Sequence, residues 1–337
     1  MRVGFTFDLR DDYLALGYSA EEVAEFESEA TVAAIAATLT SFGHSVDRIG
    51  GLERLMTRLV AGERWDLVFN IAEGLHGLGR EAAVPTVLDA CQIPYTFSDP
   101  LTLCVALHKP TAKRLVRDAG VPTPDFAVIE TPQELARVSL PLPLFVKPVA
   151  EGSSKGVSAA SKIDRRADLE QTCRQLLDQH RQPLLVERYL PGREFTVGIV
   201  GTGGDAIALG VMEIRLGARA DQAAYTYSNK TLWEDRVTYS LLEGPLADEA
   251  KSVALTAWRC LGGRDCGRID VRCDERGVVN FIEVNTLPGL NPRTADIMVL
   301  CGFLKIDYRS LLGMILDSAM RRVEVQPTAR RAGAIGR

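Results

Sequence analysis

Short apolar runs alternate with amphipathic segments through the first third of the chain. The runs that predict strands are Val3–Phe7, Val46–Ile49 and Leu67–Ile71. The segments that predict helices between them are Thr31–Phe42, Leu52–Ala61 and Arg80–Cys91. Because strands that alternate with helices in this order form a parallel sheet covered by helices, we expect residues 1–104 to form an N-terminal α/β domain of the Rossmann type.

Beyond residue 104, strands and helices follow one another less regularly, which predicts an α+β arrangement. The predicted strands are Leu144–Val149, Val157–Ser161, Leu184–Tyr189, Glu194–Val200, Ile207–Ile214, Ile269–Cys273 and Val278–Asn285. The predicted helices are Thr102–Ala119, Arg166–Gln179, Ala247–Leu261 and Ser310–Met320. We expect a central subdomain over 105–187, a C-terminal subdomain over 188–322, and a flexible tail over 323–337, which is rich in Arg, Ala and Gly.

The last two predicted strands flank a turn signal and predict a β-hairpin. If Asp274–Gly277 turns the chain, Asp270 faces Phe281 across the ladder and Arg268 faces Glu283. One face then carries the polar side chains of Arg268, Asp270, Glu283 and Asn285, and the other carries Ile269, Val271, Ile282 and Val284. Oxygen ligands without a His or Cys among them suit Mg²⁺. A solvated hairpin face is the alternative interpretation.

Two further segments carry chemistry typical of nucleotide sites. Lys147 ends a predicted strand, and the small-residue loop Glu151–Gly156 that follows offers backbone N–H groups of the kind that cradle phosphates. The lysine precedes the loop, so this is not the P-loop motif. From Leu185 to Thr196, a strand passes through a Pro-Gly turn into another strand; such a hinge can present backbone groups to an adenine edge and Glu194 to a ribose. An ordinary hairpin and an ordinary connection are the alternatives.

Composition limits the class of protein. A chain of 337 residues with 46% hydrophobic residues and a net charge of −5 predicts a soluble globular protein with no attraction for nucleic acid. No apolar run approaches the roughly 20 residues that cross a membrane, and the N-terminus lacks the apolar core of a signal peptide, which predicts a cytoplasmic protein. Seven cysteines without a C-x-x-C pair argue against a disulfide framework or a zinc site. We expect small-molecule partners.

Taken in order, several segments resemble the ATP-grasp superfamily and, within it, the D-alanine–D-alanine ligase family. They are Gln92–Ser98, Leu107–Lys109, Val146–Pro148, Glu151–Ser154, Glu187–Glu194, Gly267–Val271 and Phe281–Leu290. The resemblance runs over nearly the whole chain. It implies a three-domain fold in which ATP lies between two α+β domains, and a possible homodimer formed through the N-terminal domain.

The resemblance also implies a role for individual residues. Those implied for ATP are Lys109 and Lys147 on the phosphates, the loop of Glu151, Gly152, Ser153 and Ser154 closing over them, Glu187, Arg188, Tyr189 and Leu190 at the adenine, and Glu194 at the ribose. Those implied for two Mg²⁺ ions, with Mn²⁺ as an alternative, are Asp270, Glu283 and Asn285. Those implied for catalysis are Arg268 and the N–H of Gly289 at an oxyanion, Lys230 at the transferring phosphoryl group, and Ser153.

The implied reaction moves the γ-phosphoryl group of ATP to a substrate carboxylate. A second substrate's amine then attacks the acyl phosphate, which gives an amide and releases phosphate. In the family this reaction joins two amino acids for peptidoglycan. A ligase of other amino acids in a peptide or natural-product pathway is the first alternative, and a non-catalytic ATP-binding protein is the second.

Departures from the family pattern fall in the amino-acid pocket. The first strand runs into Phe7–Asp12 where the family has a Gly-rich turn with a substrate-binding glutamate, and no glutamate replaces it there. Glu73 or His76 takes the place of a family histidine, and Glu73 is the prediction because it directly follows a strand end. Arg293 and Thr294 stand where the family binds the second substrate's carboxylate. These departures predict that the ATP half of the site is intact while the amino-acid pocket differs, so that D-alanine is not both substrates.

Overall fold

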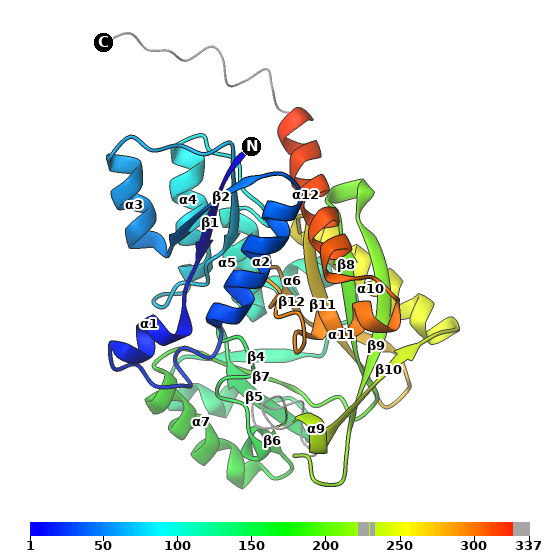
Figure 1. The fold of residues 1–337 in the computed structure, drawn as a ribbon. Coiled ribbons are helices and arrows are strands. Elements are labelled where there is room, and N and C mark those ends of the chain that lie inside the picture. Colours follow the sequence, from blue (N-terminus) through cyan, green and yellow to red (C-terminus); the bar gives the residue numbers. More distant parts are fainter. Residues whose placement is uncertain (222–228, 230–232, 326–337) are drawn as a thin grey trace.

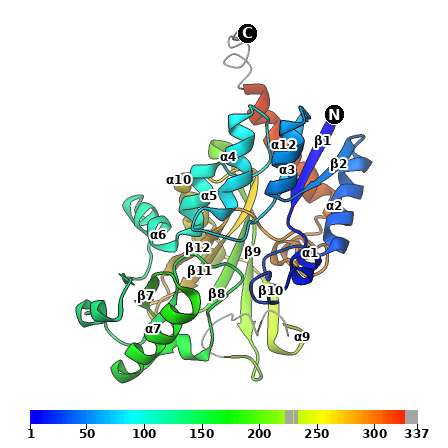
Figure 2. The same ribbon diagram turned by 90° about the vertical axis from the view of Figure 1, so that its left-hand side faces the viewer.

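Three β-sheets with helices on their faces make up the structure (Figure 1). The computed structural model describes residues 1–221, 229 and 233–325. A three-stranded sheet lies within residues 2–71, a four-stranded sheet within 126–188 and a five-stranded sheet within 194–285. Figure 2 shows the four-stranded sheet, with helix α7 (Arg166–His180), at the end of the molecule away from both chain ends. None of the described helices is long and apolar enough to cross a membrane.

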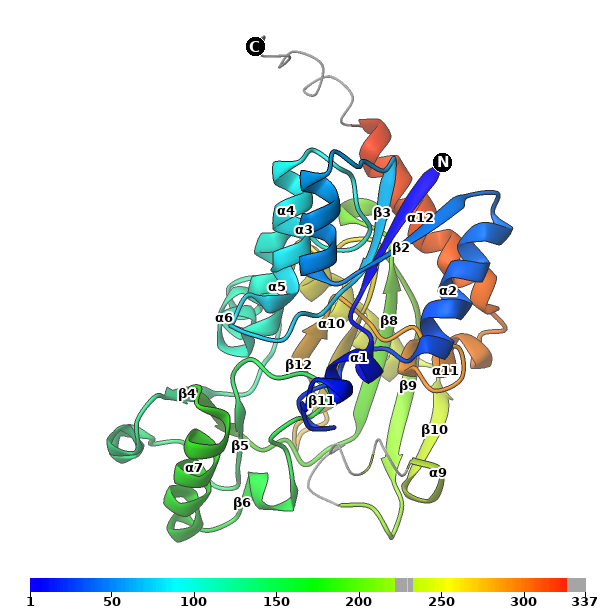
Figure 3. The same ribbon diagram turned by 60° about the vertical axis from the view of Figure 1, so that its left-hand side comes forward.

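The three-stranded sheet is parallel, in the order β2 (Ser45–Gly50), β1 (Arg2–Phe7) and β3 (Leu67–Ile71). Every residue of β3 is buried, as is β1 from Val3 onward, because helices cover both faces. Figure 3 shows which helices these are: α3 (Leu52–Val60) and α4 (Ala83–Ala90) on one face, α2 (Glu29–Ser41) and α12 (Tyr308–Val325) on the other. The predicted parallel α/β arrangement is confirmed.

The last two helices complete the core of this N-terminal sheet. Leu311 and Ile315 of α12 belong to one buried cluster with Val3 and Phe5 of β1, and α11 (Asp296–Phe303) adds to it. The last described helix thus packs against the first strand. As a result, the segment between the five-stranded sheet and α11 is fixed beside the N-terminal sheet.

Both remaining sheets are antiparallel. The four-stranded sheet has the order β4 (Phe126–Ile129), β7 (Leu184–Arg188), β5 (Leu144–Pro148) and β6 (Lys162–Ile163). The five-stranded sheet has the order β10 (Val237–Leu242), β9 (Ile207–Leu216), β8 (Glu194–Val200), β11 (Cys266–Cys273) and β12 (Val279–Asn285). The other helices are α1 (Arg10–Ala15), α5 (Pro100–Leu107), α6 (Lys109–Asp118), α9 (Trp233–Arg236), α10 (Pro245–Leu261) and the 3₁₀ turns η1 (Arg80–Ala82), η2 (Pro132–Arg137), η3 (Ala159–Ser161) and η4 (Gly203–Asp205).

The predicted helix Thr102–Ala119 is in fact two helices, α5 and α6. His108 between them has a non-helical ψ of 86°. Pro110 explains the break, because it has no N–H to donate to the carbonyl four residues earlier and its ring crowds that turn. The break turns Lys109, the first residue of α6, toward the loop after β5, where its N–H bonds the carbonyl of Val149 at 3.0 Å.

Two other sequence predictions were wrong in part. Val157–Ser161 is a turn followed by η3, because Ser158 caps the 3₁₀ turn, and the pairing with β5 begins only at Lys162. The predicted tail begins too early, because α12 continues to Val325; residues 326–337 lie outside the described residues. The elements that were not predicted are α1, β4, β10, α9 and α11, which are short or, in β10, only partly buried.

Candidate active site

The β11–β12 hairpin is the framework of the site, and its register differs from the prediction. Asp270 lies opposite Glu283, and Arg268 lies opposite Asn285. The turn is one residue longer than predicted, since Cys273 pairs with Val279, and a bulge at Ile282 adds a second shift. Each shift moves the pairing by one residue, so the two together leave Arg268, Asp270, Glu283 and Asn285 on one face, as predicted. Only the pairs that they form across the ladder differ from the prediction.

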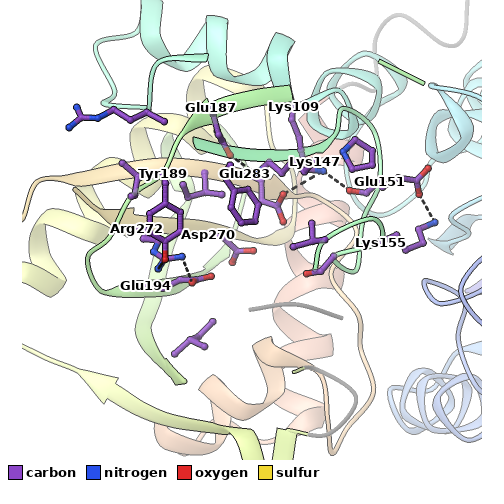
Figure 4. A pocket seen from close by; sticks show the side chains of 18 residues that line it. Lys109, Lys147, Glu151, Lys155, Glu187, Tyr189, Glu194, Asp270, Arg272 and Glu283 are labelled. Carbon is purple, nitrogen blue, oxygen red and sulfur yellow. Dashed lines mark hydrogen bonds and ion pairs between the residues drawn. The ribbon is translucent and has the colours of Figure 1, made fainter. Parts of the chain in front are cut away.

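The bulge also exchanges the places of two apolar residues. Phe281, predicted to face Asp270, is fully buried in the core under α10. Ile282, predicted to lie on the core face, lines a cavity between the two antiparallel sheets. We call this the inter-sheet cavity, and Figure 4 shows it with Asp270 and Glu283 on its floor. A bulge beside a site re-aims side chains in this way.

A buried charge triad forms one wall of the inter-sheet cavity. Glu187 on β7 lies 2.9 Å from Lys113 on α6 and 2.9 Å from Lys147 on β5, and all three side chains are nearly inaccessible. Burial disfavours the Glu187 carboxylate, but the two lysines outweigh it and hold its pKa below the usual value. Burial lowers the pKa of Lys113 to about 8, against the charge of Glu187. Lys113 was missed by the sequence analysis.

The side chain of Glu187 therefore faces the lysines, whereas the resemblance implied a contact with adenine. What remains at the opposite end of the cavity is a slot suited to a flat ring. The rings of Phe145 and Tyr189 stack with centroids 6.3 Å apart, and the guanidinium of Arg272 lies over Tyr189 at 4.9 Å. Glu194 lies at this end, 3.4 Å from Arg272 (Figure 4). Arg188 and Leu190 complete the lining.

The loop after β5 divides its residues between two cavities. Glu151 lines both the inter-sheet cavity and a second cavity at the C-terminal end of the hairpin, which we call the hairpin cavity. Ser154 lines only the first of these cavities, and Gly152 and Ser153 line only the second. Ser153 and Ser154 have φ values of 48° and 58°, in the left-handed region. Consecutive residues in that region curl the loop so that successive backbone groups face inward.

Glu25 ties this loop to the N-terminal domain, which the sequence analysis missed. Its carboxylate pairs with Lys155 of the loop at 2.7 Å and with Arg80 at 3.1 Å, and all three side chains are at most one-tenth exposed. Lys155 also pairs with Glu151 at 2.7 Å. A Cβ on Gly152 would lie 2.0 Å from the Glu25 carboxylate, so only glycine fits there. The acidic run after α1 was the signal in the sequence.

The hairpin cavity gathers most of the residues predicted for the substrates. Arg268 lies in it, paired with Asp270 at 3.7 Å and with Asp296 at the start of α11. The other predicted residues that line it are Glu73, Ser153, Asn285, Gly289 and Thr294. His76 lines a neighbouring crevice instead, Arg293 lines neither cavity, and Lys230 lies outside the described residues.

Carboxyl groups with raised pKa values form the N-terminal wall of the hairpin cavity. Partial burial, with the charges of Glu81 and Glu25, raises the pKa of Glu73 well above its usual value. Burial raises the pKa of Glu81 to about 7 and also raises that of Glu27, whose carboxylate accepts the N–H of Leu290 at 3.3 Å. This wall favours a cation, because a positive charge would stabilise all three carboxylates. Glu27 and Glu81 were missed by the sequence analysis.

The hairpin offers two carboxylates and one amide as candidate metal ligands. In the described part of the chain, no three His, Cys, Asp or Glu side chains gather closely enough to hold a metal ion by themselves. Asp270 and Glu283 stand opposite each other; Asp270 also accepts from Thr196 at 2.7 Å, and Glu283 lies 3.4 Å from Lys109. This donor set fits a hard cation whose remaining ligands come from phosphate oxygens.

Comparison with known proteins agrees with this geometry. A family model described as the D-ala D-ala ligase C-terminus matches residues 115–316. An uncharacterized protein y4sG of Sinorhizobium fredii is 32% identical over 276 residues, which cover 80% of each chain. A D-alanine–D-alanine ligase of the same organism is 31% identical over 281 residues, which cover 82% of this chain and 87% of that one.

Solved structures share the whole fold. The D-alanine–D-alanine ligase from Bacillus anthracis has a TM-score of 0.73 at 22% identity and covers 96% of this chain and 99% of its own. The same enzyme complexed with ATP has a TM-score of 0.71 at 21% identity, covering 96% and 99%. The VanG D-Ala:D-Ser ligase from Enterococcus faecalis has a TM-score of 0.73 at 18% identity, covering 94% and 99%.

These neighbours show the ATP-grasp fold, with a parallel N-terminal sheet and two antiparallel sheets around one cavity. The family model covers well over half of the chain, and the chain belongs to the D-alanine–D-alanine ligase family. The protein is accordingly an ATP-dependent ligase, as the sequence resemblance implied.

Proposed function

We propose that this ligase joins two amino acids through an acyl phosphate formed where the two cavities meet. One observation supports the meeting point: Lys109, Glu151 and Glu283 line both cavities. ATP in the inter-sheet cavity would reach the hairpin cavity with its terminal phosphate. A substrate carboxylate there would then lie in line with the group to be transferred.

The chain's own residues take distinct roles in this proposal. Lys109 and Lys147 hold the phosphates, with Glu187 positioning Lys147 from behind. Asp270, Glu283 and Asn285 hold Mg²⁺, which when bound neutralises charge on the phosphates. Arg268, held in place by Asp296, and the N–H of Gly289 face the carbonyl carbon that the amine attacks, where an oxyanion forms. The loop at Ser153 excludes water, which protects the acyl phosphate from hydrolysis.

The acidic wall supports a site for a substrate ammonium group. Glu27, Glu73 and Glu81 all line the hairpin cavity, and burial raises the pKa of each, so a substrate ammonium group beside them would stabilise their ionised forms. Glu25 is less suited because Arg80 and Lys155 already neutralise it. On the opposite side, Thr294 offers a hydroxyl to a substrate carboxylate. We propose two α-amino acids as the substrates, with D-alanine at both positions as the first pair to test.

Phosphate release from Mg-ATP tests the function directly. The purified protein is assayed against D- and L-amino acids and D-lactate, singly and in pairs, with mass detection of the product. Release with D-alanine and formation of D-alanyl-D-alanine would make this a peptidoglycan-precursor enzyme; release with another pair would favour the alternative pathway. No release with any pair would overturn the ligase proposal in favour of nucleotide binding alone. Omitting Mg²⁺, or replacing it with Mn²⁺, tests the metal.

Three coarser expectations belong with this proposal. We propose that the reaction takes place in the cytoplasm, where ATP is available, and that the protein acts on free amino acids and not on nucleic acid. We also propose a homodimer, which light scattering at assay concentration checks. We further propose the division into residues 1–104, 105–187 and 188–322, with its boundaries within α5 and at the end of β7.

A further inference from the structure

A second hollow in the N-terminal domain lies where its three parallel strands end. Asp8 follows β1, Gly51 follows β2 and Ala72 follows β3, and all three line one crevice of about 430 Å³. We call it the strand-end crevice. Helix α1 lies at the same end of the sheet (Figure 3) and contributes Tyr13. Ligands of parallel α/β sheets bind at this edge.

The crevice has room for much more than a methyl group. One water molecule takes a share of roughly 30 Å³ in the liquid, and a methyl group is of similar size. A substrate with the side chain of alanine would therefore leave the crevice nearly empty. Its walls are largely apolar or aromatic, with Tyr13, Tyr18, Leu52 and Leu75 among the lining residues.

Asp8 gives the crevice a preference for positive charge. Its side chain is 4% exposed, and it accepts hydrogen bonds from the hydroxyl of Tyr13 at 2.8 Å and the N–H of Gly74 at 2.9 Å. Both donors are uncharged, so they leave the negative charge unbalanced. The two arginines that line the crevice pair elsewhere, Arg54 with Asp12 at 3.3 Å and Arg80 with Glu25.

Glycine at position 51 keeps the space around this carboxylate. A Cβ there would lie 2.7 Å from an Asp8 oxygen, which is closer than real Cβ contacts allow. The aromatic rings of Tyr13 and Tyr18 have centroids 5.9 Å apart, and Tyr18 lies 6.3 Å from the ring of His76. A long side chain that ends in a cation can pack its methylene groups against such rings, and its cation is attracted to the ring faces.

The crevice adjoins the hairpin cavity. Glu73 lines the hairpin cavity, while its neighbours Ala72 and Gly74 line the crevice. The charge of Asp8 is among those that raise the pKa of Glu73, which places the two carboxyl groups within electrostatic range. A substrate whose α-ammonium group lies at Glu73 would therefore have its side chain near the crevice.

We propose that the strand-end crevice binds the cationic side chain of an amino-acid substrate, with the ammonium or guanidinium group on Asp8. This inference rests on the proposed ligase function and names its substrate class: one of the two amino acids is basic. Neutral side chains of equal length leave the Asp8 charge unbalanced and bind less well.

The test compares ligands that differ only in charge. Calorimetry measures binding of lysine, ornithine and arginine to the protein with ADP and Mg²⁺, against norleucine and Nε-acetyl-lysine, in both D and L forms. We expect one enantiomer of a basic amino acid to bind about tenfold or more tightly than its neutral counterpart. Equal binding of lysine and norleucine would overturn the proposal, and this comparison needs no variant.

Asp8→Asn then locates the charge. We expect the preference for lysine over norleucine to fall to about threefold or less, with ATP binding unchanged. Asp11→Asn is the matched control, because it removes the same charge from an exposed residue of α1 that does not line the crevice, and it should keep the preference. An unchanged preference in Asp8→Asn would reject this residue as the ligand.

The two proposals can fail separately. Phosphate release with D-alanine but no binding of basic amino acids would retain the ligase and reject the crevice. Binding of lysine that depends on Asp8, without phosphate release for any pair, would retain the crevice and reject the proposed reaction.

Discussion

The inter-sheet cavity and the hairpin cavity are built in different ways, although they share Lys109, Glu151 and Glu283. The inter-sheet cavity takes most of its lining from the strands β5, β7, β8, β9, β11 and β12, whose ladders fix the positions of the side chains. The hairpin cavity takes its lining from segments as far apart as Arg10 and Ala295, mainly from loops. The lining of the inter-sheet cavity can change little without disrupting a sheet, whereas the lining of the hairpin cavity can change through one loop at a time.

Charge distinguishes the two cavities further. In the inter-sheet cavity, Lys113 and Lys147 balance Glu187, whose pKa lies below its usual value. In the hairpin cavity, Glu73 and Glu81 have pKa values above theirs. A site whose lysines are held in place by a buried carboxylate suits phosphate groups, because these groups are negatively charged. A buried acidic wall, where burial disfavours the carboxylate form, suits an ammonium group.

The largest expected effect comes from Arg268→Met. Loss of the oxyanion partner should lower kcat by roughly 10²–10³-fold, with the KM for ATP nearly unchanged, because Arg268 lines the hairpin cavity and not the inter-sheet cavity. Steady-state phosphate release measures this. Arg293→Met is the matched control, since it also removes an arginine but does not line the cavity, and it should retain most activity. A variant Arg268→Met with kcat within fivefold of the original would contradict the assigned role.

Glu25→Gln tests whether the two regions are mechanically linked. Removing the shared partner of Arg80 and Lys155 leaves two buried cations, which should destabilise the protein by about 3 kcal/mol. The loop at Gly152 should also be held less firmly, so the KM for ATP should rise by about tenfold. Denaturant unfolding and steady-state kinetics measure the two effects. Glu21→Gln, on the exposed neighbouring turn, should change neither; equal effects in both variants would remove the link.

The contrast between the cavities also explains what the sequence predicted. Asp270, Glu283 and Glu194 lie in contiguous motifs on strands of one sheet, whose alternation predicts a shared face, and Lys147 faces them from β5 of the other antiparallel sheet. The predicted register was wrong because a bulge at Ile282 and a five-residue turn have no clear signal in an alternating sequence pattern. The polar face of the hairpin was predicted correctly only because the two single-residue shifts cancelled.

The hairpin cavity was predicted less completely because its residues meet only after the three sheets assemble. Glu25 and Glu27 stand in an acidic run between α1 and α2 that reads as a solvated loop. Burial against Lys155, about 130 positions away, is what makes Glu25 part of the site. Glu73 was predicted from its place after a strand end, since parallel topology can be inferred from the alternation of elements.

The acidic wall should make amino-acid binding depend on pH. Because the pKa of Glu81 is raised to about 7 in the folded protein, Glu81 stabilises the fold below its unfolded pKa of about 4.5, and this contribution is lost as pH rises through 7. Ionisation then creates the charge that an ammonium group needs. The kcat/KM for the amino acid should rise by about tenfold between pH 6 and 8, and Glu81→Gln should flatten that rise. A rise of equal size in the variant would assign the titration to another group.

The smallest expected effect comes from a substitution in the inter-sheet cavity, where the nucleotide is proposed to bind. Tyr189→Leu keeps an apolar residue in the slot but removes the ring that stacks on Phe145 and lies under Arg272. Since such ring contacts contribute about 0.5–1.5 kcal/mol, the KM for ATP should rise by about two- to tenfold, with kcat nearly unchanged. The KM for the amino acids should stay constant, because Tyr189 lines only the inter-sheet cavity of the two. Tyr18→Leu, in the strand-end crevice, is the converse control and should move only the amino-acid KM. If both variants changed both constants, the division into a nucleotide half and an amino-acid half would be wrong.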